Sequence, residues 1–190
     1  MANLTFGKKR RRVNYDLLRE VIVWTFQIAV VCLLAFVCVH YFGQRVSVIG
    51  DSMNPELKNG NITLISKAAY TMGKPKRGDV VAFKPNGNEG SHYYIKRIIA
   101  LPGETVEVVE GKIVVNGREI KERYETTEIE NLGILADTVT LKNNEYFVLG
   151  DDRQNSEDSR SADIGAVKRS EIDGKVWFVV SPGKTFGFVR

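Results

Sequence analysis

Cysteine and histidine are nearly absent from this 190-residue sequence, and residues 43–190 contain no cysteine and a single histidine, His92. Both cysteines, Cys32 and Cys38, fall in an apolar run near the N-terminus. A disulfide framework and a cysteine-rich zinc site are therefore excluded. A metal site with several histidine ligands is excluded as well, and Ser-His-Asp chemistry has only one candidate base. We expect no metal and no cofactor.

Most of the chain also lacks an excess of charge of either sign. The formal net charge is +4, but residues 1–20 hold six basic and two acidic side chains, which leaves 21 of each sign in residues 21–190. A nucleic-acid-binding protein is expected to carry a basic stripe on its folded part. The balanced charge of residues 21–190 indicates that nucleic acid is not a partner.

One long hydrophobic run, from Val21 to Phe42, contains no Asp, Glu, Lys or Arg. At ~1.5 Å per residue, a helix of this length reaches ~33 Å, enough to cross the core of a bilayer. The buried helix of a soluble domain rarely stays apolar on every face over this length. A cleaved signal peptide would have a shorter apolar region and a small-residue cleavage site, which residues 39–42 do not offer. We predict a permanent membrane anchor over residues 21–42.

Basic residues flank this run unequally. Lys8 to Arg12 stand before it, whereas Arg45 is the only basic residue close behind it. The positive-inside rule then places residues 1–20 in the cytosol as a basic tail and residues 43–190 outside, across the membrane. We expect a single-pass protein of the cell membrane, with the lipid bilayer as one partner.

Residues 43–190 read as a mostly β domain, because short apolar segments alternate with turn residues such as Asn, Gly and Pro. No alternation of strands and helices is present, which argues against a doubly wound fold. The charged, weakly patterned stretch from Arg118 to Asp137 is expected to form a mobile loop. The predicted strands are Val46 to Ile49, Ile62 to Ser66, Val80 to Phe83, Tyr93 to Ile99, Thr105 to Val109, Lys112 to Val115, Tyr146 to Leu149 and Lys175 to Val180.

A first candidate for chemistry is the run Gly50-Asp51-Ser52-Met53-Asn54-Pro55, directly behind a predicted strand. A serine in a sharp turn can present its hydroxyl and a backbone N–H to one cleft, although serine before proline is more often only a turn residue. The Gly-x-Ser-x-Gly elbow is not met, because Asn54 replaces its second glycine. Gly-Asp-Ser is similar to the nucleophile block of GDSL-type esterases, but those enzymes need a histidine near the C-terminus, and none follows His92.

A second candidate is Lys96, in the run from Tyr94 to Glu104. Apolar neighbours on both sides predict that the side chain is at least partly buried. Burial disfavours the ammonium form, so the neutral amine could serve as a general base. An exposed lysine on an edge strand is the alternative. His92 would lie on the same face of the strand as Lys96, and we expect it to contact solvent.

A third candidate is the polar run from Gly150 to Arg160, which can form a loop fixed by its own hydrogen bonds. A solvated loop is the alternative. Asp151 and Asp152 are adjacent on an extended chain and point apart, so paired carboxylate catalysis is not indicated. The spacing of a calcium-binding loop is not met either.

These three runs, in this order behind one N-terminal span, resemble type I signal peptidases, the Ser/Lys membrane proteases that remove signal peptides from preproteins. The run Arg77-Gly78-Asp79-Val80-Val81 and the pair Trp177-Phe178 support the resemblance. The short chain with one span is similar to the compact Gram-positive form. The resemblance implies an extracytoplasmic domain of antiparallel sheets or a barrel, and an endopeptidase whose substrates are preproteins cut after Ala-x-Ala.

The resemblance also implies roles for individual residues. Ser52 would be the nucleophile and Lys96 the general base, so that no histidine is needed. Ser156 would hydrogen-bond the Lys96 amine and orient it. Ion pairs that hold the third run would come from Arg97, Asp158 and Arg160.

The oxyanion would be bound by the backbone N–H of Ser52. Some relatives supply a second donor through a serine two residues earlier; here that residue is Gly50, so the second donor is left open. Asp152 stands where many relatives carry Asn. Positions that line the pockets for small substrate side chains are matched by Val48, Met53, Leu57, Tyr94 and Ile95, with an ordinary core role equally open for Leu57.

Two other readings compete with this one. An intracellular self-cleaving repressor of the Ser/Lys type would carry a DNA-binding domain where this chain has its apolar run. A membrane-anchored β module without enzymatic activity predicts an exposed Lys96 with an ordinary pKa.

Ser52 follows Phe42 by ten residues, at most ~36 Å of extended chain, so the site is expected near the outer membrane surface.

Overall fold

The computed structural model describes residues 15–71, 73–88, 90–181 and 186–189. The chain divides into two compact units, Met1–Val39 and His40–Arg190, which are described separately. The basic residues Lys8 to Arg12, on which the predicted orientation rests, lie outside the described residues.

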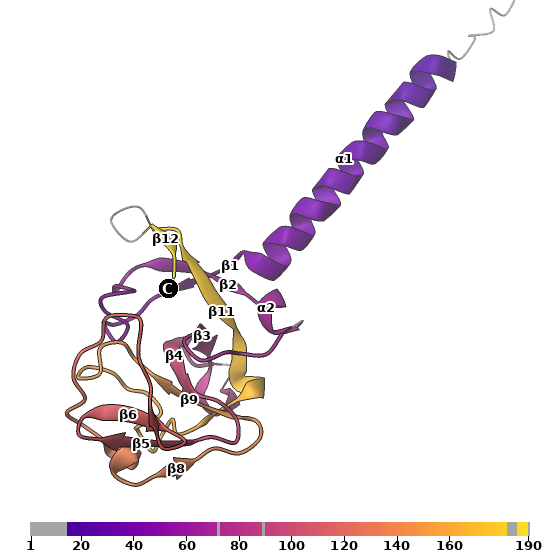
Figure 1. The fold of residues 1–190 in the computed structure, drawn as a ribbon. Coiled ribbons are helices and arrows are strands. Elements are labelled where there is room, and N and C mark those ends of the chain that lie inside the picture. The colour runs from indigo at the N-terminus through magenta and orange to yellow at the C-terminus, as the bar shows by residue number, and fades with distance from the viewer. Residues whose placement is uncertain (1–14, 72, 89, 182–185, 190) are drawn as a thin grey trace, which may run out of the picture. The chain divides into compact units, whose positions relative to one another are not determined.

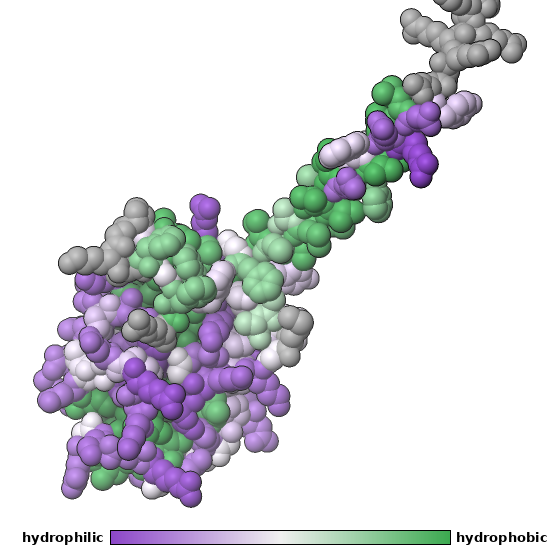
Figure 2. Space-filling model, turned by 45° about the horizontal axis from the view of Figure 1, so that its top comes forward, coloured by the Kyte–Doolittle hydropathy of each residue, from purple (hydrophilic) through white to green (hydrophobic). Residues whose placement is uncertain are grey.

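A single helix, α1 (Tyr15–Phe42), contains the whole apolar run and begins before it. Its 28 residues correspond to ~42 Å, and by length and composition it could cross a membrane. None of its residues is buried within the protein, and Figure 2 shows that hydrophobic side chains cover most of its length. Thr25, a polar interruption, donates its hydroxyl to the carbonyl of Val21 at 2.6 Å and so satisfies itself within the helix.

The second unit consists mainly of antiparallel strands in two sheets (Figure 1). In the larger sheet the strands lie in the order β1-β2-β11-β3-β4-β9-β10, with β12 also paired to β11, and the smaller sheet has the order β7-β6-β5-β8. The larger sheet comprises β1 (Gln44–Ser47), β2 (Ile62–Ser66), β3 (Val80–Phe83), β4 (Tyr94–Ala100), β9 (Glu145–Leu149), β10 (Val167–Lys168), β11 (Ile172–Val179) and β12 (Gly187–Phe188). The smaller sheet comprises β5 (Thr105–Val109), β6 (Lys112–Val115), β7 (Arg118–Glu119) and β8 (Val139–Thr140).

Short helical turns connect several of these strands. They are α2 (Ala68–Thr71) and the 3₁₀ turns η1 (Pro85–Gly87), η2 (Gly133–Ala136) and η3 (Arg169–Glu171).

Two tight turns build most of the smaller sheet. Glu110 and Gly111 join β5 to β6 with φ values of 52° and 75°, and Asn116 and Gly117 join β6 to β7 with 52° and 72°. Two successive residues with positive φ form the turn whose twist matches that of a hairpin. β5, β6 and β7 therefore form two antiparallel hairpins in series.

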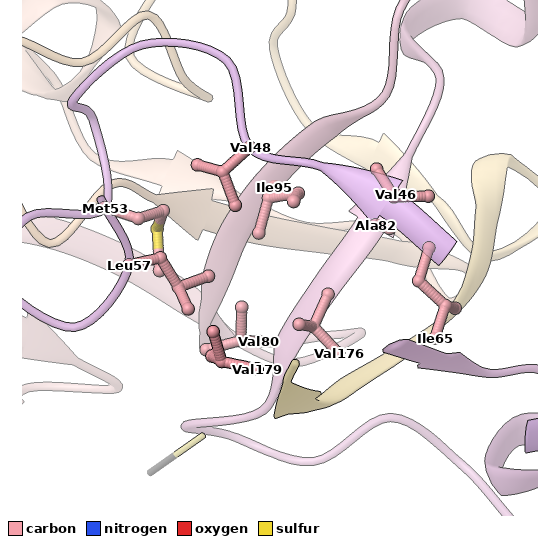
Figure 3. Close-up of a cluster of buried hydrophobic side chains, with 10 residues drawn as sticks. All are labelled: Val46, Val48, Met53, Leu57, Ile65, Val80, Ala82, Ile95, Val176 and Val179. Carbon is pink, nitrogen blue, oxygen red and sulfur yellow. The ribbon is translucent and has the colours of Figure 1, made fainter. Parts of the chain in front are cut away.

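The core is packed so that β4 lies at its centre, between β3 and β9. Every residue of β4 from Ile95 to Ala100 is buried, including Lys96 and Arg97. Figure 3 shows the cluster on one side of this strand, which contains Val46, Val48, Met53, Leu57, Ile65, Val80, Ala82, Ile95, Val176 and Val179. Two charged side chains, Lys96 and Arg97, are therefore buried on a central strand of the larger sheet.

The predicted strands agree with the structure for the larger elements. The bounds of β2, β3, β5 and β6 match residue for residue, and those of β4 and β9 differ by one residue at one or both ends. β1 lies two residues earlier than predicted, and β11 begins three residues before its predicted start. The strands β7, β8, β10 and β12 were not predicted, because two residues are too few to show an alternating pattern. The mostly β, antiparallel fold class is confirmed.

Candidate active site

The nucleophile candidate Ser52 lies in the loop that follows β1. The loop is anchored at Val48, whose N–H donates to the carbonyl of Asn61 at 2.8 Å. The N–H of Gly50 donates to the side chain of Asn59 at 3.2 Å. Gly50 has φ = 83°, in the left-handed region that favours glycine, so a turn at this residue precedes Ser52.

Lys96 meets Ser52 across this loop. The Nζ atom of Lys96 lies 2.5 Å from Oγ of Ser52, although the two residues are 44 positions apart in the chain. Lys96 is only 4% exposed, because β4 is covered on both faces. The predicted burial of Lys96 is confirmed, and the exposed lysine expected for a non-enzymatic module is not observed. His92 lines the same cleft, but Lys96 is the base within hydrogen-bonding distance of the serine.

Burial changes the protonation of this lysine. Removal from water lowers the pKa of Lys96 to about 8, while the negative charges of Asp158 and Glu157 raise it and limit the change. Near pH 8, Lys96 is therefore neutral in a large share of the molecules. A neutral amine can accept the proton of the Ser52 hydroxyl.

Arg97, the next residue on β4, forms an ion pair with the loop 150–160, and its partner there is Asp151. Its Nε and Nη2 atoms donate to the two carboxylate oxygens of Asp151 at 2.8 and 2.6 Å, and both side chains are fully buried. The guanidinium carbon also lies 3.9 Å from the ring centre of Tyr124. Burial alone would lower the pKa of Arg97, but Asp151 raises it and keeps the guanidinium charged. Arg97 therefore ties β4 to the loop 150–160, and the structure identifies Asp151 as the residue that it pairs with.

Asp158 and Arg160 pair with each other, as expected from the resemblance. Two hydrogen bonds of 2.9 Å join the guanidinium to the carboxylate, and Asp158 also accepts the N–H of Gly150 at 3.1 Å. Burial would raise the pKa of Asp158, but Arg160 outweighs this and holds the pKa below its usual value. Asp158 therefore joins the first residue of the loop, Gly150, to its last, Arg160.

Ser156 does not make the hydrogen bond to Lys96 that the resemblance implies. Its Oγ is buried and forms no hydrogen bond of regular geometry within the described residues, although its proximity to Asp158 helps to hold the pKa of that carboxyl below its usual value. It lies instead beside Gly150: a Cβ atom added there would be 2.2 Å from Oγ of Ser156 and 2.4 Å from the carbonyl oxygen of Ser52. Only a residue without a side chain fits between the two serines, and the sequence did not reveal this role of Gly150.

Asp152 also supports the nucleophile loop. Its backbone N–H donates to the carbonyl of Ser52 at 3.1 Å. Its carboxylate accepts the N–H groups of Gln154 and Asn155 at 3.2 Å each and the side-chain amide of Asn155 at 3.1 Å. Asp152 therefore fixes the turn that carries Asn155 to the rim of the cleft.

The stretch from Arg118 to Asp137, expected from its composition to form a mobile loop, makes several hydrogen bonds with the loop 150–160. Thr127 donates its hydroxyl to Asp152 at 3.2 Å, and Gln154 donates its amide to Glu130 at 2.6 Å. The N–H of Ile134 donates to the carbonyl of Arg160 at 3.0 Å. Further bonds join Arg153 to Glu122 and Arg160 to the carbonyl of Asn131. These hydrogen bonds fix the loop 150–160 against residues 118–137.

A cleft of about 430 Å³ opens in front of Ser52 and Lys96. Of the predicted substrate-binding residues, Val48, Met53, Tyr94 and Ile95 line it. Leu57 is fully buried in the cluster of Figure 3 and does not line the cleft, so it is a core residue in this structure. Within the described ranges, no three His, Cys, Asp or Glu side chains are grouped so that they could hold a metal ion.

Comparison with known proteins identifies the family to which this sequence is similar. A family model described as "Signal peptidase, peptidase S26" matches residues 20–181. Signal peptidase I P of Bacillus subtilis subsp. natto is 34% identical over 170 residues, which cover 86% of this chain and 90% of that protein. Signal peptidase I T of Bacillus subtilis (strain 168) is 34% identical over 166 residues, 84% of each chain.

Two further similarities have sequence identities of 30% and 32%. Signal peptidase IB of Staphylococcus aureus (strain COL) is 30% identical over 183 residues, 88% of this chain and 93% of that protein. The crystal structure of a signal peptidase I from Enterococcus faecalis V583 is 32% identical in sequence, covers 55% of this chain and 97% of that chain, and has a TM-score of 0.44.

The buried pair of Arg97 and Asp151 gives a stability prediction. Asp151→Asn would leave the guanidinium charged without its counter-ion in the core, so we expect the free energy of unfolding to fall by ~3 to 5 kcal/mol. Denaturant titration of the full chain in detergent measures this. Glu119→Gln, which breaks the exposed pair with Lys112, should change it by less than ~1 kcal/mol. Equal effects of the two substitutions would contradict the central role of the buried pair.

The close fit at Gly150 gives a second prediction. In Gly150→Ala the new methyl group would displace the backbone of Ser52 and the side chain of Ser156, so we expect the rate of preprotein cleavage to fall on the order of 100-fold. The matched control is Gly90→Ala, where a Cβ would meet only the side chain of Asn88 at 3.4 Å. Normal cleavage by Gly150→Ala would show that the two serines need not be held in this way.

Proposed function

The chain belongs to the signal peptidase family, peptidase S26, and on this premise we propose that it is a membrane-anchored serine endopeptidase that removes signal peptides with Ser52 and Lys96 as its catalytic residues. The observation that carries the assignment of residues is the 2.5 Å separation between Nζ of Lys96 and Oγ of Ser52 on a buried strand.

The reaction follows from the state of the lysine. As Oγ of Ser52 attacks the scissile carbonyl, the neutral amine of Lys96 takes the hydroxyl proton, and a tetrahedral intermediate forms. The resulting ammonium gives that proton to the departing amine, so the mature chain leaves and the signal peptide stays bound to Ser52 as an ester. Water then attacks the ester with Lys96 again as base, which releases the signal peptide and restores the serine.

The negative oxygen of the intermediate needs hydrogen-bond donors. Within the described residues, the backbone N–H of Ser52 donates to no acceptor, which supports its assignment as one donor. Gly50 has no hydroxyl to offer as the second. One donor of this kind is worth ~2.7 to 4 kcal/mol of transition-state stabilisation, so the identity of the second bears directly on the rate.

The preference for small side chains before the cut is proposed from the lining of the cleft. Val48, Met53 and Ile95 are at most 6% exposed and contribute their remaining apolar surface to it. We propose that these side chains form the walls of the pockets that take Ala before the cut. Tyr94 also lines the cleft, and its side chain is partly exposed.

We also propose the arrangement across the membrane: residues 1–20 in the cytosol, residues 21–42 in the bilayer and residues 43–190 outside. The supporting observations are the basic run before the apolar segment and the length of α1. A preprotein whose signal peptide lies in the same bilayer would be the substrate.

Cleavage of an Ala-x-Ala preprotein by the purified full chain in detergent tests the catalytic assignment. Ser52→Ala and Lys96→Ala should each lower the rate by roughly a thousandfold or more, because nucleophile and base act as a unit. His92→Ala should stay close to the parent protein, with folding checked for all three. Cleavage by Lys96→Ala at the parent rate would overturn the assignment and make His92 the next candidate.

The pKa of Lys96 gives a prediction for pH dependence. Only the neutral amine is active, so kcat/KM should rise about tenfold per pH unit below the Lys96 pKa of about 8 and level off above it. The measurement is kcat/KM between pH 6 and 10 under conditions where the chemical step limits the rate. A flat profile would contradict Lys96 as the base.

A further inference from the structure

The charged groups exposed in the catalytic cleft are acidic. Asp51 and Glu157 both line it and both are exposed. Among the residues that line this cleft, the only Lys or Arg is Lys96, which is buried. A substrate that passes Ser52 therefore meets exposed negative charge and no exposed Lys or Arg.

Glu157 is held at a particular place in this cleft. The hydroxyl of Tyr94 donates to Oε2 of Glu157 at 3.2 Å. The two nearest arginines of the same loop are already engaged, Arg153 with Glu122 and Arg160 with Asp158. No ion pair involving Glu157 is found in the part of the chain that the structure describes, so its carboxylate can accept a cation from a substrate.

A second hollow, of about 570 Å³, continues from the cleft at this point. Asn155 and Glu157 line both spaces, whereas the apolar residues Val48, Met53 and Ile95 line only the first. If the residues before the cut occupy the apolar part, the chain after the cut has to leave Ser52 in another direction. The only residues shared with this second hollow are at the Asn155–Glu157 rim.

From this arrangement we infer that the first residues of the mature chain pass over the rim formed by Asn155 and Glu157, and that Glu157 determines specificity there by favouring basic and disfavouring acidic side chains. This inference rests on the proposed function, because it concerns how the same site reads its substrate. The charge acts at an exposed position, so its effect is modest and is weakened by salt.

The test uses the full chain in detergent and preproteins that differ only in having Lys, Gln or Glu at the first, second or third position after the Ala-x-Ala cut. We expect kcat/KM to change about two- to fivefold for each unit of charge at the position nearest Glu157, in the order Lys, Gln, Glu. Glu157→Gln should remove the preference and Glu157→Lys should reverse it. In 0.5 M salt the preference of the parent protein should shrink.

Measurements at pH 9.5, above the pKa of Lys96, keep the effect of Glu157 on that base out of the comparison. The ratio between substrates is compared within each variant, so a general loss of rate does not enter. Glu110→Gln, at the exposed turn between β5 and β6, is the matched control and should keep the parent preference.

Two results would overturn the inference while leaving the proposed function intact. One is equal cleavage of the Lys, Gln and Glu substrates by the parent protein. The other comes from a further substrate set with Lys, Gln or Glu at the middle position of Ala-x-Ala: a preference that Glu157→Gln abolishes only in this set would place Glu157 beside the residues before the cut. Cleavage of the Gln substrate by Lys96→Ala at the parent rate would instead overturn the proposed function and this inference together.

Discussion

The removal of one lysine from water is the constraint on which the catalytic domain depends. The role of base proposed for Lys96 requires that its ammonium form is disfavoured, and the structure achieves this by placing the side chain on β4, between β3 and β9. The same burial encloses Arg97, whose charge cannot be lost. The fold must therefore place a carboxylate in contact with the Arg97 guanidinium and keep carboxylates out of hydrogen-bonding distance of the Lys96 amine.

The ion pairs around the site satisfy both demands. Asp151 is committed to Arg97 by two hydrogen bonds, and Asp158 is committed to Arg160 by two more. The group that lies within hydrogen-bonding distance of the Lys96 amine is the Ser52 hydroxyl, which carries no charge. Buried ion pairs add little net stability compared with apolar packing, so their value here lies in fixing where each charge is.

The stretch from Arg118 to Asp137 extends this control outward. Tyr124 covers the Arg97 guanidinium, Thr127 bonds Asp152, and the backbone of Ile134 bonds Arg160. Asp152 in turn bonds the carbonyl of Ser52. A segment without regular secondary structure over most of its length thus helps to position Ser52, the proposed nucleophile, through its contacts with the loop 150–160.

The sequence by itself determined the features that local pattern encodes: the apolar run of α1, the strands β2, β3, β5 and β6 with their turns, and Ser52 and Lys96 as candidates. Alternation and turn chemistry act over a few residues, so they can be read along the chain. The loop 150–160 contains several acidic residues, and their spacing does not indicate that Asp151 is the partner of Arg97. Nor does the local sequence show that Gly150 separates two serines, or decide between core and cleft for Leu57. Only the tertiary structure decided these, because each depends on which distant segments pack together and on how much room they leave.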